Sequence, residues 1–338
     1  MYREMAEEGL VDLFPHFHIQ KSITIRQEDF LISPSLVPKQ YINGEVRAAG
    51  GARRCTLHYG PTVWCGGHGS ISKVRRVQGD RVDNICVKTP HVPQHSLCPE
   101  SLFQWLAYTT LEGVGIRGAI PRVYDIFQYA GEVRFSMEYI DGMSSIQKIV
   151  EAENPDLVFL QIMAQTSILL GVLEERLRLD HRDLKADNLW IRPVPIHYSA
   201  FVGGIRWEII CPFQVVILDF GFSCIGGATG NAIISLSDGI LPRIDPCPKE
   251  GRDLFQLFTS LWSIPELRTR LSPAFTKDME EFLSYRDISY ATLVKQPSQP
   301  HWIYLLVSDP MFRYPPLHPF SLLRILSIKY ESIRLHSE

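Results

Sequence analysis

The sequence lacks the features that mark secreted, disulfide-rich or zinc-binding proteins. Its seven cysteines are spread along the chain, and no two of them form a CxxC pair. Neither a structural zinc site nor a disulfide scaffold is therefore expected. The first ten residues, MYREMAEEGL, are charged where a signal peptide would be apolar. These absences predict a soluble intracellular protein, in the cytoplasm or nucleus, in a reducing compartment.

Uninterrupted apolar runs and an excess of charge of one sign are also lacking. The most apolar stretch, residues 159–173, contains Gln161, Gln165 and Thr166, which favours a buried helix over a membrane span. The formal net charge is −3, and this gives no general attraction to nucleic acid or to an anionic membrane. Neither is expected as a partner. A hydrophobic content of 45% beside 21% charged residues predicts a folded globular protein.

What the sequence does contain is an eight-residue run, HRDLKADN, from His181 to Asn188. Phosphoryl transfer needs a carboxylate that orients a hydroxyl, a cation near the moving phosphate and an oxygen ligand for Mg²⁺. Asp183, Lys185 and Asn188 are the residue types for these three tasks. A short loop can point all three side chains in one direction, so this run is the candidate catalytic loop.

Glycine-rich and lysine motifs precede this loop. Gly67, Gly69 and Ser72 belong to a G-x-G-x-x-S-x-V pattern that ends at Val74, and glycines of this kind let backbone N–H groups approach phosphates. The apolar strand predicted over residues 85–88 ends at Lys88. A helix is predicted over residues 99–111, and its apolar stripe marks a buried face.

Acidic motifs follow the loop. An apolar strand predicted over residues 215–218 leads into Asp219-Phe220-Gly221, and Asp253 begins an apolar helix that extends to residue 262. Residues 193–213 are rich in aromatic and β-branched residues and contain a Gly-Gly pair, which predicts an extended hairpin.

In this order the motifs resemble those of eukaryotic-type Ser/Thr protein kinases, in a divergent form similar to kinases of large DNA viruses. The resemblance implies a bilobal α+β fold, in which a small antiparallel β N-lobe with one helix and a larger, mainly helical C-lobe bind ATP between them. The implied boundaries are an N-terminal extension of unknown role (1–55), an N-lobe (56–141) and a C-lobe (142–338). The 193–213 hairpin would be an insertion in the C-lobe.

The resemblance also implies the role of each site residue. Asp183 would orient the substrate hydroxyl and accept its proton, and Lys185 would steady the γ-phosphate. Asn188 and Asp219 would bind Mg²⁺ or Mn²⁺. The implied ATP-binding residues are Gly67, Gly69, Ser72, Val74, Cys86, Lys88, Met137, Glu138, Tyr139 and Trp190. Structural or regulatory roles would belong to Gln104, His181, Arg182, Phe220, Gly221 and Asp253.

Three positions depart from the family pattern. Gln104 falls where the family has the glutamate that pairs with the strand lysine, and Glu100 lies one helical turn earlier. Trp190 would either stack on the adenine or crowd its pocket. The Ala-Pro-Glu tripeptide that closes the activation segment is missing between residues 222 and 252.

The expected function is ATP- and Mg²⁺-dependent phosphorylation of Ser/Thr hydroxyls in a protein substrate. The departures leave two alternatives open, a pseudokinase or scaffold that binds without turnover and a kinase of a small molecule. If the chain is viral, a location in the virion is a further option.

Overall fold

The computed structural model describes residues 19–32, 55–66, 69–93, 95–228, 230–237, 241, 245–285, 288–294, 309, 311–331 and 335–337. Gly67 of the predicted glycine pattern lies outside the described residues. The contacts divide the chain into two units. The first unit comprises Met1–Trp105 and Pro121–Ile140, and the second comprises Leu106–Ile120 and Asp141–Glu338.

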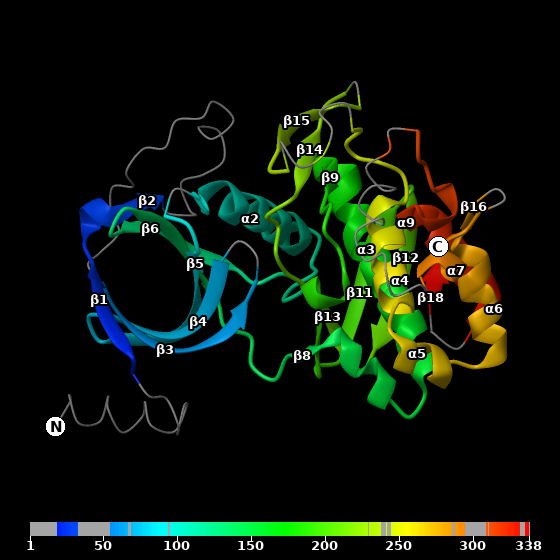
Figure 1. The fold of residues 1–338 in the computed structure, drawn as a ribbon, viewed down its shortest axis with the longest axis horizontal. Coiled ribbons are helices and arrows are strands. Elements are labelled where there is room, and N and C mark those ends of the chain that lie inside the picture. Colours follow the sequence, from blue (N-terminus) through cyan, green and yellow to red (C-terminus); the bar gives the residue numbers. More distant parts are fainter. Residues whose placement is uncertain are drawn as a thin grey trace. The chain divides into compact units, whose positions relative to one another are not determined.

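The first unit is built on one seven-stranded antiparallel sheet, which curls strongly (Figure 1). Its strand order is β1-β3-β4-β5-β7-β6-β2. The strands are β1 (Lys21–Ile25), β2 (Phe30–Ile32), β3 (Cys55–Cys65), β4 (Gly69–Gln78), β5 (Arg81–Pro90), β6 (Val123–Tyr129) and β7 (Glu132–Glu138). The short helix η1 (Gln27–Asp29) lies between β1 and β2. Both edge strands therefore come from the part of the chain predicted as an N-terminal extension.

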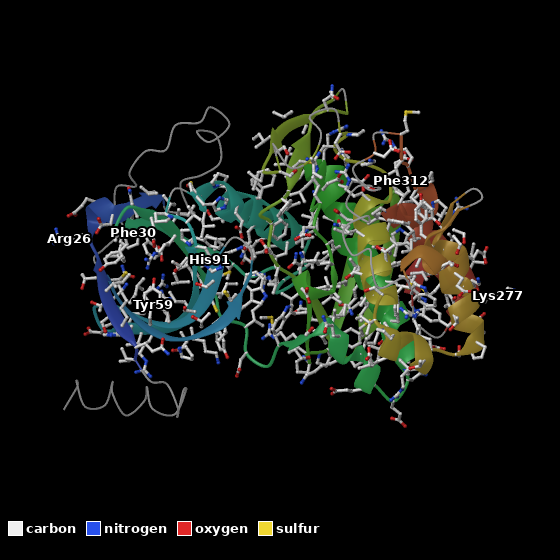
Figure 2. The ribbon with its side chains drawn as sticks, viewed as in Figure 1. Arg26, Phe30, Tyr59, His91, Lys277 and Phe312 are labelled. Atoms are coloured by element: carbon white, nitrogen blue, oxygen red, sulfur yellow. A yellow bond between two sulfur atoms is a disulfide. The ribbon has the colours of Figure 1, made fainter. Side chains whose placement is uncertain are left out.

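Alternating apolar residues give the sheet one face that is buried in a core. Ile23, Leu57, Val74 and Phe127 are buried together with Phe30 and Tyr59, and the last two are labelled on the curled sheet in Figure 2. Because successive side chains of a strand point to opposite faces, one face of each strand joins this core. Helix α2 (Cys98–Gly113) follows β5.

The second unit has a buried central helix, α3 (Pro155–Leu177). Asn154 caps it by accepting a hydrogen bond from the Leu157 amide, and Pro155 occupies its first turn. The helix is long and apolar enough to cross a membrane, but 83% of its most apolar window is buried within the structure. That burial agrees with the expected core helix. The remaining helices are η4 (Ile146–Glu151), η5 (Ala186–Asn188), α4 (Arg252–Trp262), α5 (Pro265–Arg270), α6 (Pro273–Phe282), α7 (Tyr290–Val294), η6 (Pro315–Leu317) and α9 (Pro319–Lys329).

The described part of the second unit also contains four small antiparallel sheets, in the strand orders β13-β10-β8, β11-β12-β18, β15-β14-β9 and β16-β17. Their strands are β8 (Ser144–Ser145), β9 (Leu179–Asp180), β10 (Leu189–Arg192), β11 (Ile196–Val202), β12 (Ile205–Cys211), β13 (Gln214–Ile217), β14 (Cys224–Gly226), β15 (Ala232–Ser235), β16 (Ser284–Tyr285), β17 (Ile288–Ser289) and β18 (Leu335–Ser337). Strands β11 and β12 form the hairpin of the 193–213 region.

These sheets overturn the predicted fold class. The expectation of a bilobal kinase fold with a mainly helical C-lobe is wrong, because strands recur throughout the second unit. Several of these strands are only two to four residues long, so their alternation is too short to register as a pattern in the sequence. Pairing with strands distant in sequence, such as β12 with β18, stabilises segments that have little strand signal of their own.

A disulfide between Cys224 and Cys247 is a second departure from the sequence-based expectation. It joins residues 23 apart, and both side chains are fully buried. The other cysteines, 55, 65, 86, 98 and 211, form no disulfide. Without a CxxC pair, nothing in the sequence spacing indicated this bond.

Candidate functional site

The candidate catalytic loop converges on the Asp183 carboxylate. Strand β9 leads into the loop, and η5 ends it. The Lys185 ammonium donates to both oxygens of Asp183, at 2.9 and 3.2 Å. The Asn188 amide donates to Asp183 Oδ2 at 3.0 Å and to its backbone carbonyl at 2.7 Å. The structure thus brings together the three residues that the motif predicted to act together.

Asp253 holds the start of this loop from the first turn of α4. Its two carboxylate oxygens accept the backbone N–H groups of His181 at 2.7 Å and of Arg182 at 2.9 Å. Arg182 has a φ of 65°, a left-handed conformation that costs free energy for a residue with a side chain. The paired hydrogen bonds offset that cost and orient Asp183, the next residue.

Asn188 and Asp219 lie at the same end of two paired strands. Leu189 of β10 faces Ile217 of β13, and the Leu218 amide donates to the Asn188 carbonyl at 2.9 Å. Register therefore brings together two positions that are far apart in the sequence. An amide oxygen and a carboxylate are the ligand types that Mg²⁺ prefers, so the donor set fits the predicted metal.

Phe220 and His181 pack together next to Asp219 and the start of the candidate catalytic loop. Phe220 is fully buried, and its ring centroid lies 5.0 Å from that of His181. His181 Nε2 lies 2.9 Å from the Leu218 carbonyl oxygen. Asp219 has a φ of 62°, and its carboxylate accepts the Gly221 amide at 3.3 Å. The Trp190 indole N–H donates to the Asp187 carbonyl at 3.0 Å, which orients that ring.

In the first unit, Lys88 pairs with Glu100 and not with Gln104. Lys88 Nζ lies 2.5 Å from Glu100 Oε1, and the two side chains are 2% and 4% exposed. The Gln104 amide instead donates to the Pro121 carbonyl at 2.8 Å and to the Met137 sulfur at 3.5 Å. Counting back from the next strand put Gln104 at the family position, one helical turn after Glu100, the acid within reach on the helix that the structure pairs with Lys88. The signal for Glu100 was that it is the only acid in the first turn of α2.

The described residues of the glycine pattern, Gly69, Ser72 and Val74, lie in β4. A Cβ on Gly69 would lie 2.6 Å from the Thr89 carbonyl oxygen, so only glycine allows the observed approach of β4 to β5. Ser72 faces Val87, and Val74 faces Ile85 across the same pair of strands. Trp64, which sequence reasoning did not single out, lies with its ring centroid 5.8 Å from Lys88 Nζ.

The predicted hinge includes the last two residues of β7, Met137 and Glu138, and the residue after them, Tyr139. Met137 faces Cys86 across β5 and β7, and burial raises the pKa of the Cys86 thiol to about 12. The thiol is therefore an apolar packing group at neutral pH. The Glu138 amide donates to the Arg122 carbonyl at 2.8 Å. Lys73 Nζ lies 4.6 Å from the centroid of the Tyr139 ring.

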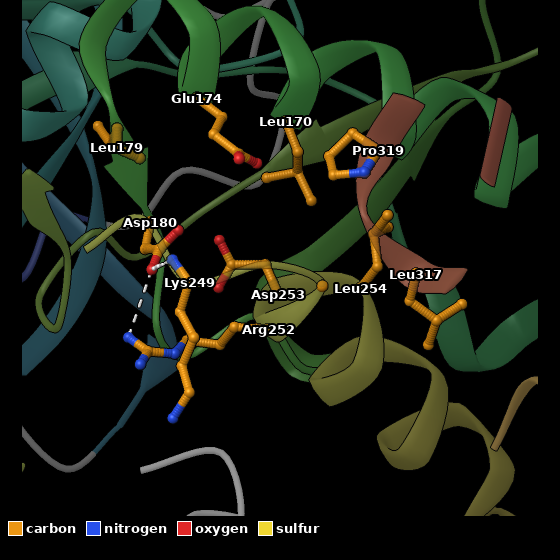
Figure 3. A pocket seen from close by; sticks show the side chains of 11 residues that line it. Leu170, Glu174, Leu179, Asp180, Lys249, Arg252, Asp253, Leu254, Leu317 and Pro319 are labelled. Atoms are coloured by element: carbon orange, nitrogen blue, oxygen red, sulfur yellow. Dashed lines mark hydrogen bonds and ion pairs between the residues drawn. The ribbon is translucent and has the colours of Figure 1, made fainter. Parts of the chain in front are cut away.

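Behind the catalytic loop, the second unit has a pocket lined by charged and apolar side chains (Figure 3). Arg252 Nη1 and Asp180 Oδ2 form an ion pair of 3.4 Å there, and the Lys249 amide donates to the same Asp180 oxygen at 2.9 Å. Burial raises the pKa of Asp180 well above its usual range, although the charge of Arg252 opposes this. Lys249 pairs with Asp245 and Glu174 with His318, both outside the lining. Each of these charges already has a partner within the protein, which indicates that the pocket is a structural support for the loop.

Comparison with known proteins gives one informative match. The chain is 25% identical over 132 residues to "Probable kinase 098L" of Invertebrate iridescent virus 3. The match covers 38% of this chain and 24% of the viral protein, so the chain spans about a quarter of the length of that relative. No protein-family model matches the chain. The similarity supports a kinase-like relationship and phosphoryl transfer in general.

Proposed function

We propose that the protein transfers the γ-phosphoryl group of ATP to Ser or Thr hydroxyls of a protein substrate, with Mg²⁺ or Mn²⁺ as cofactor. The observation that supports this best is the convergence of Lys185 and Asn188 on the Asp183 carboxylate. The partial match to a protein named a kinase points to the same reaction class.

Each charged group has a defined task in this proposal. Asp183 orients the substrate hydroxyl and accepts its proton, while Lys185 neutralises charge on the transferred group. Asn188 and Asp219 hold the divalent cation, which neutralises phosphate charge when it is bound. Lys88, kept in place by Glu100, binds the α- and β-phosphates. Ser/Thr specificity rests on Lys185, which is typical of that branch of the resemblance.

The test compares the purified wild type with Asp183→Asn, using radiolabelled ATP and Mg²⁺ with generic protein substrates. Loss of the proton acceptor should lower labelling at least about 100-fold, while nucleotide binding, measured by calorimetry, stays close to wild type. Asp187→Asn is the matched control, because Asp187 lies in the same loop but its side chain accepts from Gln147 on the exposed surface. Equal labelling by Asp183→Asn and wild type would overturn the proposal.

A binding function without turnover is the second candidate, and the position of Trp64 favours it. The ring lies where a Cβ on Gly66 would be, 1.9 Å from its nearest atom, and close to Lys88. A bulky ring close to both Gly66 and Lys88 would restrict the space for the phosphates of ATP. A nucleotide-dependent rise in melting temperature without any labelling would establish this alternative. Transfer to a metabolite, but to no protein, would instead establish a small-molecule kinase.

A further inference from the structure

The Cys224–Cys247 disulfide closes the chain segment that follows Asp219-Phe220-Gly221. Cys224 begins β14, which pairs with β9, and Cys224 itself faces Asp180. Asp180 is the residue that precedes the catalytic loop. At the other end, Cys247 lies two residues after Asp245, and the Cys247 amide donates to the Gly230 carbonyl at 2.9 Å. The bond therefore fixes both ends of the segment beside the entrance to the loop.

Residues inside the closed segment hold the Arg182 side chain. Its Nη1 group donates to Ser235 Oγ at 3.0 Å and to Ser237 Oγ at 2.9 Å. Its Nη2 group lies 3.5 Å from a carboxylate oxygen of Asp245. Arg182 immediately precedes Asp183. A movement of the segment would therefore move the backbone that carries the candidate catalytic carboxylate.

Asp245 is the centre of a buried ion cluster. Besides Arg182, it pairs with Lys249 at 3.2 Å and with Arg252, and all four side chains are at most 2% exposed. Burial, helped by the charge of Arg252, lowers the pKa of Lys249 to about 8. Desolvation thus works strongly against these charges. Desolvation offsets much of the attraction in buried ion pairs, and Cys247, two residues from Asp245, is held covalently to Cys224.

We propose that the Cys224–Cys247 disulfide is a redox-sensitive clamp that keeps Asp245 against Arg182 and so positions the catalytic loop. A dithiol reductant supplies the electrons. Its thiolate attacks one cysteine sulfur, which forms a mixed disulfide and releases the other cysteine. Its second thiol then attacks the mixed disulfide and releases the first cysteine. The S–S bond of the protein breaks, two protons go to the Cys224 and Cys247 sulfurs, and the reductant leaves as a disulfide. Asp245 then loses its anchor, and phosphoryl transfer slows.

The proposal rests on the proposed phosphotransferase function, and its test separates the two. The full chain is oxidised, divided into samples with and without dithiothreitol, and the thiols of Cys224 and Cys247 are counted by alkylation and mass spectrometry. In parallel, kcat and KM for ATP are measured, together with hydrogen exchange of the His181 and Arg182 amides. Reduction of this pair should lower kcat about tenfold, leave KM within twofold, speed exchange at both amides and be reversed by reoxidation.

Variants separate a clamp from a merely structural bond. The double variant Cys224→Ser/Cys247→Ser should have the low kcat of the reduced protein and no response to dithiothreitol. Asp245→Asn should lower kcat in the oxidised protein and Asp245→Glu should largely restore it, as expected of a positioning residue. Cys65→Ser, which removes an exposed free thiol, should respond to dithiothreitol as wild type does.

Two outcomes would overturn the clamp: equal, measurable kcat in the disulfide and dithiol forms, or alkylation of both cysteines after oxidation. If exchange at His181 and Arg182 follows the redox state but no form labels any substrate, the clamp stands and the phosphotransferase proposal fails.

Discussion

The Lys88–Glu100 pair of the first unit and the Asp183 loop of the second unit place charge by different means. Lys88 and Glu100 are almost completely buried and rely on each other at 2.5 Å. Asp183 is held by an amide, and by Lys185, whose side chain is 34% exposed. The Lys88–Glu100 pair therefore depends on two buried charges that neutralise each other. The Asp183 carboxylate depends instead on hydrogen bonds that orient it, and its ammonium partner, Lys185, is partly exposed to water.

The largest expected effect comes from breaking the buried pair. Glu100→Gln removes the carboxylate charge that pairs with the buried Lys88 ammonium at 2.5 Å, which should lower the free energy of unfolding by about 3–5 kcal/mol. Gln104→Met, which removes a buried hydrogen bond at similar volume, should cost about 1–2 kcal/mol. Urea unfolding of both variants at pH 7 checks the difference. A greater loss for Gln104→Met would contradict the assignment of Glu100 as the partner.

A smaller effect should follow when the hydrogen bonds of the loop are weakened. Asp253→Asn retains one acceptor oxygen for two backbone amides, so either His181 or Arg182 loses its partner. We expect kcat to fall about 10- to 100-fold, or about 1.4–2.8 kcal/mol, with KM for ATP little changed. Steady-state phosphorylation assays measure both constants.

Asp156→Asn is the matched control for this variant. Asp156 also accepts a backbone amide, that of Ser272 at 3.0 Å, but it lies at the start of α3, away from the loop. Its substitution should lower stability and leave kcat intact. An equal loss of kcat in both variants would mean that Asp253 acts through overall stability.

The smallest effect concerns His318 and Glu174, a half-buried pair in the second unit. His318 Nε2 lies 3.1 Å from Glu174 Oε1, with side chains 29% and 19% exposed. The hydrogen bond to Glu174 raises the pKa of His318 above 6.5, although burial opposes the rise. The resulting stabilisation is fully present below the unfolded-state pKa and is lost as pH rises through the folded-state pKa.

Unfolding free energies of wild type and Glu174→Gln should therefore differ by about 1 kcal/mol at pH 5.5. The difference should shrink as the pH is raised through the folded-state pKa of His318. A difference independent of pH would show that Glu174 stabilises α3 and α9 by packing alone.

Much of the site in the second unit could be predicted, because its groups are close in sequence. Asp183, Lys185 and Asn188 lie within one short loop, so their spacing brings their side chains close together. The Lys88 partner was predicted less well, since Gln104 and Glu100 lie one helical turn apart and only the packing of α2 decides which of them faces the lysine. The sequence gives no indication that Trp64 lies near Lys88, because that contact depends on how β3 packs in the sheet.

The fold as a whole was predicted least well. Kinase-like motifs led to an expected helical C-lobe, whereas the described part of the second unit contains short antiparallel strands from several regions. Such strands gain their hydrogen bonds from distant partners, and these partners are invisible to local periodicity.

The sequence by itself therefore determined which side chains meet in the loop, because Asp183, Lys185 and Asn188 lie within six residues of one another. It also determined the buried helix over residues 155–177, through its cap and apolar content. Only the tertiary structure decided that Glu100 neutralises Lys88, that Asn188 lies beside Leu218 and that Cys224 bonds to Cys247. Each of these contacts joins separate elements, so packing and strand register select the partner among several candidates of similar local signal.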